Sequence, residues 1–427
     1  MTTSTTEEWK TTILAGLANY IDAGSIVAGS VALGLWVKLF HLTPTFVGLI
    51  GAFSANAISA GIGALIGGRL CDIFGRKKIY QYDMLFYAFG MLWLVFAMAP
   101  WMIVAGFVMV GLAVGADIPA SWSLIAEQAP EGARGKHSGV AQALWYLGPV
   151  VVLLLSLIFR LLNVDSVLAT RIVFAHLVIV ALGLTFLRSK MAESKAWVDA
   201  KAALERGENE EEKITNSHGN LAELFTRKHL GSMAFLIGMY GLWNLWAGTN
   251  GFFFPYILQT VGAQSDTMSV LLQTGGFILS MFSIGFVFMR LSDRVNQRTL
   301  FAASAIIQVV GMALLALFPL TTPVAIAYIV LLQFGGGFGA QSFFQLWSAE
   351  LFPTLLRSTA QGLMFAVVRI GLGIFSFFTP LLIATGFNKL AWILTGFLVA
   401  SGVVGWIWAP RNEGKSLEQI QMEIQNS

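Results

Sequence analysis

Long apolar runs separated by short polar loops are the main feature of the chain. Runs of about 20 apolar residues, the length that a helix needs to cross a bilayer, lie at residues 11–37, 45–69, 79–98, 102–126, 137–160, 166–188, 230–258, 267–291, 299–319, 323–348, 358–385 and 388–409. The longest polar stretch between them covers residues 189–228, and a short polar tail follows the last run. This pattern predicts an all-α membrane protein with twelve transmembrane helices and both termini on one side.

Two polar motifs at the ends of these runs each occur twice, at nearly the same offset. The first has the form Glu-x-x-Pro-x-x-x-Arg and covers Glu127 to Arg134 and again Glu350 to Arg357. The second, GGRLCDIFGRKK at Gly67 to Lys78, has a weaker copy around Asp293. Two motifs repeated at a common offset indicate two copies of one six-helix unit. We therefore expect two pseudo-symmetric six-helix bundles: an N-terminal bundle in 1–188, a cytoplasmic linker in 189–228, and a C-terminal bundle with a short cytoplasmic tail in 229–427.

The composition excludes several classes of protein. The chain is 56% hydrophobic and 11% charged, whereas soluble proteins carry roughly 25% charged residues. The single cysteine, Cys71, excludes an internal disulfide and a cysteine cluster for a metal, and we expect no metal and no cofactor. The basic residues lie in short loops beside apolar runs, so nucleic acid is not expected as a partner. The sequence lacks the GxSxG, HExxH and GxxxxGK[ST] motifs, and we expect no enzyme.

The distribution of lysine and arginine predicts the orientation in the membrane. If both termini are cytoplasmic, Arg369 lies within the membrane and only four basic residues face outward, namely Lys38, Arg160, Arg171 and Lys389. All other basic residues are then cytoplasmic, as the positive-inside rule requires. We therefore expect a multi-pass protein of a bacterial inner or plasma membrane with both termini in the cytoplasm.

The repeated motifs carry charges that suit a gate at the cytoplasmic ends of the helices. Gly68 and Gly75 allow close helix approach and a tight turn. Acidic and basic residues at these ends can form ion pairs that open when the two halves rock against each other. The predicted gate residues are Gly68, Asp72, Gly75, Arg76, Lys77, Glu127, Arg134, Asp293, Arg294, Glu350 and Arg357.

These features together resemble the major facilitator superfamily over essentially the whole chain. Within that superfamily the chain resembles the sugar porters. The segment AESKAWV at 192–198 is similar to their PESPRWL segment, and Gly248-Thr249-Asn250 resembles their GxN segment in helix 7, where Asn244 stands at the place of a glutamine. Gln142 in helix 5 matches a sugar-contacting glutamine of that family. The resemblance implies transport by alternating access, and we expect the chain to act as a monomer in the lipid bilayer.

Two segments depart from the sugar porters. Gln345 and Arg369 stand where that family usually carries tryptophan. The segments VVRIG at 367–371 and GADIP at 115–119 instead resemble those of aromatic-acid and nicotinate symporters. The resemblance therefore leaves two substrate classes open, polyhydroxylated solutes and organic carboxylates.

Three charged residues are expected within the membrane. Asp22 lies in the first helix, where withdrawal from water favours the protonated form of a carboxyl group, and proton-coupled sugar porters have an acid at the matching place. Asp117 is the second candidate for proton coupling, or the partner of Arg369. A purely structural role stays open for each acid. The planar guanidinium of Arg369 suits a substrate carboxylate, and the alternative is an ion pair with Asp22 or Asp117.

Neutral polar and aromatic side chains on three other helices predict a site for hydroxyl groups. The predicted substrate-binding residues are Gln142, Trp243, Asn244, Asn250, Gln341, Gln345 and Arg369. Without an ATP-binding motif, the energy must come from an ion gradient or from the solute gradient. We predict a secondary active transporter that carries a sugar, a polyol such as inositol, or a sugar acid together with H+. The alternatives are a proton symporter of an organic carboxylate, and a facilitative uniporter or channel.

Overall fold

The computed structural model describes residues 6–130, 132–206, 221–262, 264–410, 412, 415 and 417–426, and the secondary structure of this part of the chain is helical, without strands. The membrane-crossing elements of the first half are α1 (Thr6–Phe40), α2 (Pro44–Ala52) with α3 (Ile58–Phe74), α4 (Arg76–Val95), α5 (Pro100–Gln128), α6 (Arg134–Leu161) and α7 (Ser166–Arg188). Apolar residues that face lipid remain exposed on these helices, for example Ile179 and Phe186 of α7.

The second half repeats this order of elements. Its crossing elements are α10 (Arg227–Thr260), α11 (Asp266–Ser283) continued by the π-turn η1 (Ile284–Phe288) and α12 (Met289–Leu291), α13 (Gln297–Leu317), α14 (Thr322–Gly337) with α15 (Ala340–Glu350), α16 (Arg357–Thr385) and α17 (Phe387–Trp408). The prediction of twelve crossings is thus confirmed over the described residues.

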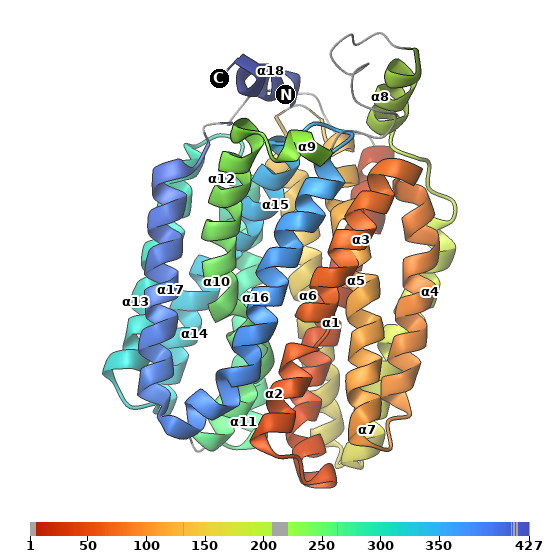
Figure 1. The fold of residues 1–427 in the computed structure, drawn as a ribbon. Coiled ribbons are helices and arrows are strands. Elements are labelled where there is room, and N and C mark those ends of the chain that lie inside the picture. The colour runs from red at the N-terminus through yellow and green to blue at the C-terminus, as the bar shows by residue number, and fades with distance from the viewer. Residues whose placement is uncertain are drawn as a thin grey trace.

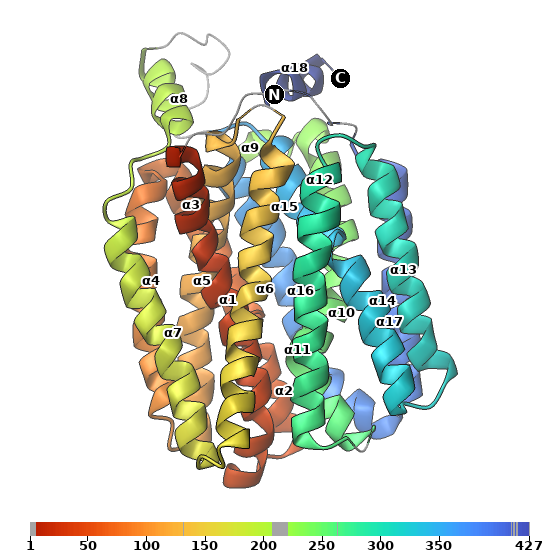
Figure 2. The same ribbon diagram turned by 180° about the vertical axis from the view of Figure 1, so that it is seen from behind.

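Both chain ends lie at the same end of the bundle (Figure 1), which we call the termini end. The short helices α8 (Lys195–Arg206), α9 (Leu221–Leu224) and α18 (Leu417–Asn426) also lie there, as both views show (Figures 1 and 2). The sequence predicted a polar linker at 189–228. The structure shows that this linker contains two helices, α8 in its first part and α9 near its end. Residues 207–220 of this linker lie outside the described residues.

Two predicted runs are broken rather than continuous. Run 45–69 is interrupted between α2 and α3 at residues 53–57, and run 323–348 is interrupted between α14 and α15 at Phe338 and Gly339. At the first break the backbone of Ala57 leaves the helical region, with φ −121° and ψ −131°. Irregular backbone at membrane depth persists where it lines a cavity or is buried in protein, and both breaks lie in the middle of a crossing.

Glycines let the two halves pack closely at both ends of the bundle. A Cβ atom at Gly68 of α3 would lie 2.3 Å from the carbonyl oxygen of Ser358 in α16. At the opposite end, a Cβ atom at Gly48 of α2 would lie 2.3 Å from the carbonyl oxygen of Phe377 in α16. Only glycine permits these backbone contacts, so the two halves touch each other at both ends of the bundle.

Candidate functional site

A small cavity lies between the two halves. Side chains of α1 and α6 and the break between α2 and α3 form one wall, and α10, α11, α14, α15 and α16 form the other. The cavity measures about 40 Å³, which corresponds to roughly three water molecules. The lining residues with a polar atom or an aromatic ring are Asn56, Trp145, Tyr146, Trp243, Asn244, Trp246, Asn250, Phe277, Gln333, Gln341 and Arg369. Of the predicted substrate-binding residues, five therefore line it.

Aromatic side chains of the second half are held in place by hydrogen bonds behind the cavity wall. Trp243 Nε1 donates to Gln308 Oε1 at 2.7 Å. Trp246 Nε1 donates to the hydroxyl of Tyr328 at 3.2 Å, and that hydroxyl donates to Asn250 Oδ1 at 2.9 Å. Two indole rings and the amide of Asn250 are thus fixed before any solute arrives, which lowers the entropic cost of binding.

Arg369 connects the two halves at the edge of the cavity. Its Nη1 donates to both the side-chain and the main-chain oxygen of Asn56 in the first half, the main-chain contact at 3.3 Å. Its Nη1 and Nη2 also donate to Asn244 Oδ1 at 3.4 Å and to the hydroxyl of Tyr240 at 3.2 Å. The guanidinium stacks 4.3 Å from the ring of Phe365. Its Nε–H is buried and has no acceptor among the described residues.

The predicted ion pair of Arg369 with Asp22 or Asp117 is not formed among the described residues, so that alternative is wrong for this conformation. Asp117 is instead paired with Arg188, whose Nη1 lies 2.7 Å from Asp117 Oδ1. Asp22 is 3% exposed, and its Oδ2 accepts a hydrogen bond from Trp145 Nε1 at 3.0 Å. Trp145 itself lines the cavity.

Gln142 and Gln345 bind each other across the two halves. Gln142 Nε2 donates to Gln345 Oε1 in a short hydrogen bond, and both side chains are buried. Neither residue lines the cavity in this closed conformation. Gln142 Oε1 and Gln345 Nε2 have no partner among the described residues, so one acceptor and one donor stay available. Their predicted role in substrate binding remains a prediction.

Glu127 is the hub of an ion-pair network at the termini end. Its Oε1 accepts from Arg76 Nη2 and from Arg357 Nη1, both at 2.8 Å, and its Oε2 accepts from Ser194 Oγ at 2.5 Å. Arg76 also pairs with Asp72 at 3.1 Å. Arg357 belongs to the second half, Arg76 and Asp72 to the first half and Ser194 to the linker, so this network holds the two halves together.

Further contacts between the halves involve the termini of helices. Asp72 Oδ2 accepts from the N–H and the hydroxyl of Thr359, both at 2.7 Å. Arg134 Nε donates to Glu350 Oε1 at 3.0 Å. Asp293, in the turn after α12, accepts from the backbone N–H groups of Gly135 and Lys136 at 2.9 and 3.0 Å. Burial raises the pKa of the Asp293 carboxyl, and these two N–H groups oppose that effect.

The remaining predicted gate residues lie beside this network. Gly75 has a φ of 97°, a left-handed conformation that favours glycine, and forms the sharp turn between α3 and α4. Lys77 of the first half donates its backbone N–H to Glu193 Oε2 of the linker at 3.1 Å. Arg294 contributes a positive charge that acts on Asp293. The structure therefore brings all predicted gate residues to one end of the bundle.

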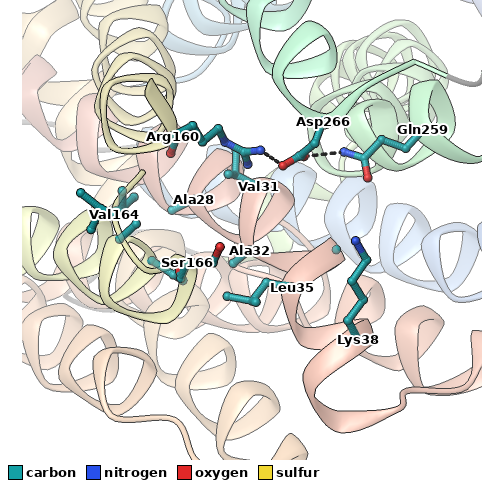
Figure 3. A pocket seen from close by; sticks show the side chains of 15 residues that line it. Ala28, Val31, Ala32, Leu35, Lys38, Arg160, Val164, Ser166, Gln259 and Asp266 are labelled. Carbon is teal, nitrogen blue, oxygen red and sulfur yellow. Dashed lines mark hydrogen bonds and ion pairs between the residues drawn. The ribbon is translucent and has the colours of Figure 1, made fainter. Parts of the chain in front are cut away.

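The opposite end has its own ion pair between the halves. Arg160 at the end of α6 contacts Asp266 at the start of α11, and Gln259 Nε2 donates to Asp266 Oδ1 at 2.8 Å (Figure 3). These side chains border a cavity of about 240 Å³, with Lys38 and Ser166 also on its wall (Figure 3). Arg160 and Asp266 are 24% and 58% exposed, and exposed ion pairs are weak. This ion pair is therefore more exposed than the buried Glu127 network at the termini end.

Among the residues of these networks that were not found from the sequence, three make contacts to the predicted charged residues Arg369 and Asp117. Asn56 lies inside a predicted helix and receives Arg369 only because that helix is broken. Arg188 lies at the end of α7, where the sequence does not distinguish it from the basic residues of the loops. Tyr240 is an aromatic residue in an apolar run. Only Asn56 had a signal in the sequence, because it is an amide within a run of small residues.

A cavity midway between two six-helix halves, with polar contacts closing both ends, defines a transporter that works by alternating access. The family model described as "Sugar (and other) transporter" matches residues 45–423. The chain belongs to this family, within the major facilitator superfamily, and is a multi-pass membrane transporter rather than an enzyme.

Individual relatives and a solved structure agree with this assignment. The chain is 46% identical over 419 residues to the minor myo-inositol transporter IolF of Bacillus subtilis, covering 98% of this chain and 94% of the relative. It is 25% identical to the cis,cis-muconate transport protein of Acinetobacter baylyi, covering 86% of each. Its fold matches the proton:xylose symporter XylE, solved with 6-bromo-6-deoxy-D-glucose, at a TM-score of 0.80 and 18% identity, covering 97% of this chain and 98% of the other.

Proposed function

We propose that the chain is a secondary active transporter that carries a cyclic polyol, with myo-inositol as the first candidate, together with a proton. The observation that supports this substrate class is the composition of the cavity wall. Indole rings of Trp145, Trp243 and Trp246 offer flat apolar surfaces for the C–H faces of a ring. The amides of Asn250 and Gln341 both donate and accept, as hydroxyl groups require. The 46% identity to a myo-inositol transporter adds independent support.

The small volume of the cavity indicates how the solute is admitted. A space of about 40 Å³ holds only a few waters, so binding requires the halves to separate on one side. Separation breaks the hydrogen bond between Gln142 and Gln345 and exposes two more amides to the solute. The bound solute then contacts these two amides in place of their contact with each other. Contacts that exist in only one conformation shift the equilibrium towards that conformation.

Asp22 is the proposed proton-binding residue. It lies within α1 and is 3% exposed, so its ionised form is costly in the membrane. Trp145 donates to Asp22 Oδ2 at 3.0 Å and also lines the cavity, which links the protonation state to the solute site. Moving one charge through 100 mV supplies about 2.3 kcal/mol, enough for roughly fortyfold accumulation of the solute.

We assign the termini end to the cytoplasm and the membrane to the bacterial plasma membrane, with the monomer as the transporting unit. The excess of lysine and arginine at that end supports the orientation. The Glu127 network is then the inner barrier, and the Arg160–Asp266 pair forms part of the outer barrier. The two bundles, 1–188 and 229–427, are the proposed moving units, and the linker 189–228 joins them.

A second candidate is proton symport of an organic carboxylate. The observation that favours it is the buried Nε–H of Arg369, which has no acceptor among the described residues and stands ready for an anionic oxygen. The likeness to a cis,cis-muconate transport protein points the same way. We rank it second because Arg369 is already engaged by Asn56, Tyr240 and Asn244.

Ligand binding to the purified protein separates the two candidates. Thermal unfolding is measured with myo-inositol and, in parallel, with cis,cis-muconate. A ligand at about 100 times its Kd stabilises the folded state by about 2.7 kcal/mol. We expect stabilisation by myo-inositol and its loss in Asn250→Ala. Stabilisation by the carboxylate alone would reverse the ranking.

A further inference from the structure

The break between α2 and α3 presents the oxygen atoms of Asn56 to Arg369 of the other half. The first hydrogen bond of α3 runs from the N–H of Gly61 to the carbonyl oxygen of Ala57, at 3.0 Å. The carbonyl oxygen of Asn56 therefore lies outside the helical ladder and can accept from another element. Arg369 Nη1 donates to this oxygen at 3.3 Å and also to Asn56 Oδ1. One residue at the break thus holds a terminal nitrogen of the guanidinium through two acceptors.

Close packing on both sides of the break fixes this contact. A Cβ atom at Gly61 of α3 would lie 3.0 Å from the carbonyl oxygen of Ala366 in α16. A Cβ atom at Gly373 of α16 would lie 2.9 Å from the carbonyl oxygen of Ala52, the last residue of α2. Glycine at these two positions lets α16 touch both helices that flank the break. The backbone packing of α16 therefore brings Arg369 to the break.

Within the described part of the chain, all acceptors of Arg369 are neutral oxygens. Besides Asn56, they are Asn244 Oδ1 at 3.4 Å and the hydroxyl of Tyr240 at 3.2 Å. A guanidinium always carries its charge, and it binds a carboxylate more strongly than a neutral oxygen. Asn56 and Arg369 both border the cavity. A carboxylate that entered the cavity would therefore compete with Asn56 for Arg369 Nη1.

We propose that Asn56 determines the substrate class of the central site, because its two oxygens occupy Arg369 Nη1 and so disfavour the binding of carboxylates relative to neutral polyols. This inference rests on the proposed function and names the residue that selects between its two candidate substrates. An acceptor that belongs to the protein is present at a high effective concentration. A carboxylate must displace Asn56 before it can bind both terminal nitrogens of the guanidinium, whereas hydroxyl groups of a polyol can bind the amides elsewhere on the cavity wall.

Binding of two ligands to the purified protein tests the proposal. The affinities for cis,cis-muconate and for myo-inositol are measured in the parent, in Asn56→Ala and in Asn56→Asp. Asn56→Ala removes the competing side-chain oxygen, so the ratio of muconate affinity to myo-inositol affinity should rise at least about tenfold. Asn56→Asp places a permanent anion beside Arg369 Nη1, so the same ratio should fall below that of the parent. A purely structural role of Asn56 would alter both affinities together and leave their ratio unchanged.

Two further variants show whether the gain acts through Arg369. The double variant Asn56→Ala/Arg369→Gln should lose the gain in muconate affinity, because the cation is gone. The matched control is Asn388→Ala. The amide of Asn388 donates to the carbonyl oxygen of Ala316 at 2.6 Å, and Asn388 does not line the cavity. Its replacement should leave the ratio at the value of the parent.

The possible outcomes separate this inference from the proposed function. An unchanged ratio in Asn56→Ala, in a parent that binds myo-inositol, would overturn the role of Asn56 alone. A parent that binds muconate more tightly than myo-inositol would overturn both. If the parent binds neither ligand, the proposed function falls, and muconate binding gained in Asn56→Ala but not in Asn56→Asp would still support the role of Asn56, whereas no gain would overturn it.

Discussion

Replacing Glu127 by glutamine should open the termini end, because this carboxylate is the counterion of two buried guanidinium groups from opposite halves. Both contacts measure 2.8 Å, and the side chains of Glu127 and Arg76 are fully buried. Glutamine has similar size but no charge, so Arg76 and Arg357 are left close together without their shared anion. Breaking a buried pair by removing one partner costs about 3–5 kcal/mol.

The cost falls mainly on the closed state, since both arginines become hydrated when the halves separate at this end. About 3 kcal/mol shifts the equilibrium towards the open state roughly a hundredfold. The assay is labelling of a single thiol by a maleimide added from the termini end. A suitable reporter is Ala349→Cys in a Cys71→Ala background, because Ala349 is 2% exposed and lines a small gap between α15 and the first half.

We expect Glu127→Gln to accelerate labelling of this reporter by at least about tenfold. The matched control is Glu193→Gln. Glu193 accepts from the backbone N–H groups of Arg76 and Lys77 and so joins the linker to the first half, not the two halves to each other. Glu193→Gln should leave the labelling rate unchanged. Equal rates in Glu127→Gln and the parent would refute the reasoning that this carboxylate holds the halves together.

Three further predictions concern single residues. Gly68→Ala should also open the termini end and raise reporter labelling, since its Cβ would lie 2.3 Å from the Ser358 carbonyl oxygen, whereas Gly183→Ala, with no atom within 4 Å, should do neither. Arg369→Gln should change the affinity for myo-inositol by less than about tenfold, because a polyol carries no charge for the guanidinium to pair with. A loss of about thirtyfold or more in affinity would instead indicate an anionic substrate. Asp22→Asn should abolish proton-driven accumulation and retain counterflow, and undiminished uphill uptake would remove Asp22 from the coupling role.

Most of the fold could be predicted from the sequence because the signals for it are local or repeated. Apolar runs of membrane length and the paired motifs at Glu127 and Glu350 gave the twelve crossings and brought the gate residues to one end. The same local signals could not show the breaks at 53–57 and 338–339, since hydropathy is continuous across both. The break beside Asn56 is tied to Arg369, a residue more than three hundred positions away in the chain.

Part of the candidate site was predicted because its residues follow a local helical pattern. Trp243, Asn250 and Gln341 share helix faces that periodicity places towards the interior, and they line the cavity. The partner of Asp117 depends on how α7 packs against α5, which no pattern within either helix encodes. The sequence therefore did not distinguish Arg188 from the basic residues of the loops, and it offered Arg369, the one cation expected within the membrane, as a possible partner of Asp117.

The central claim, polyol transport driven by protons, is tested most directly by uptake of labelled myo-inositol into proteoliposomes that contain only this protein. An inward pH gradient is imposed, and the parent is compared with Asp22→Asn. The account predicts transient accumulation above the external concentration in the parent, collapse of that accumulation by a protonophore, and equilibration without accumulation in the variant. Uptake by the parent that never exceeds the external concentration, with or without the gradient, would contradict the account.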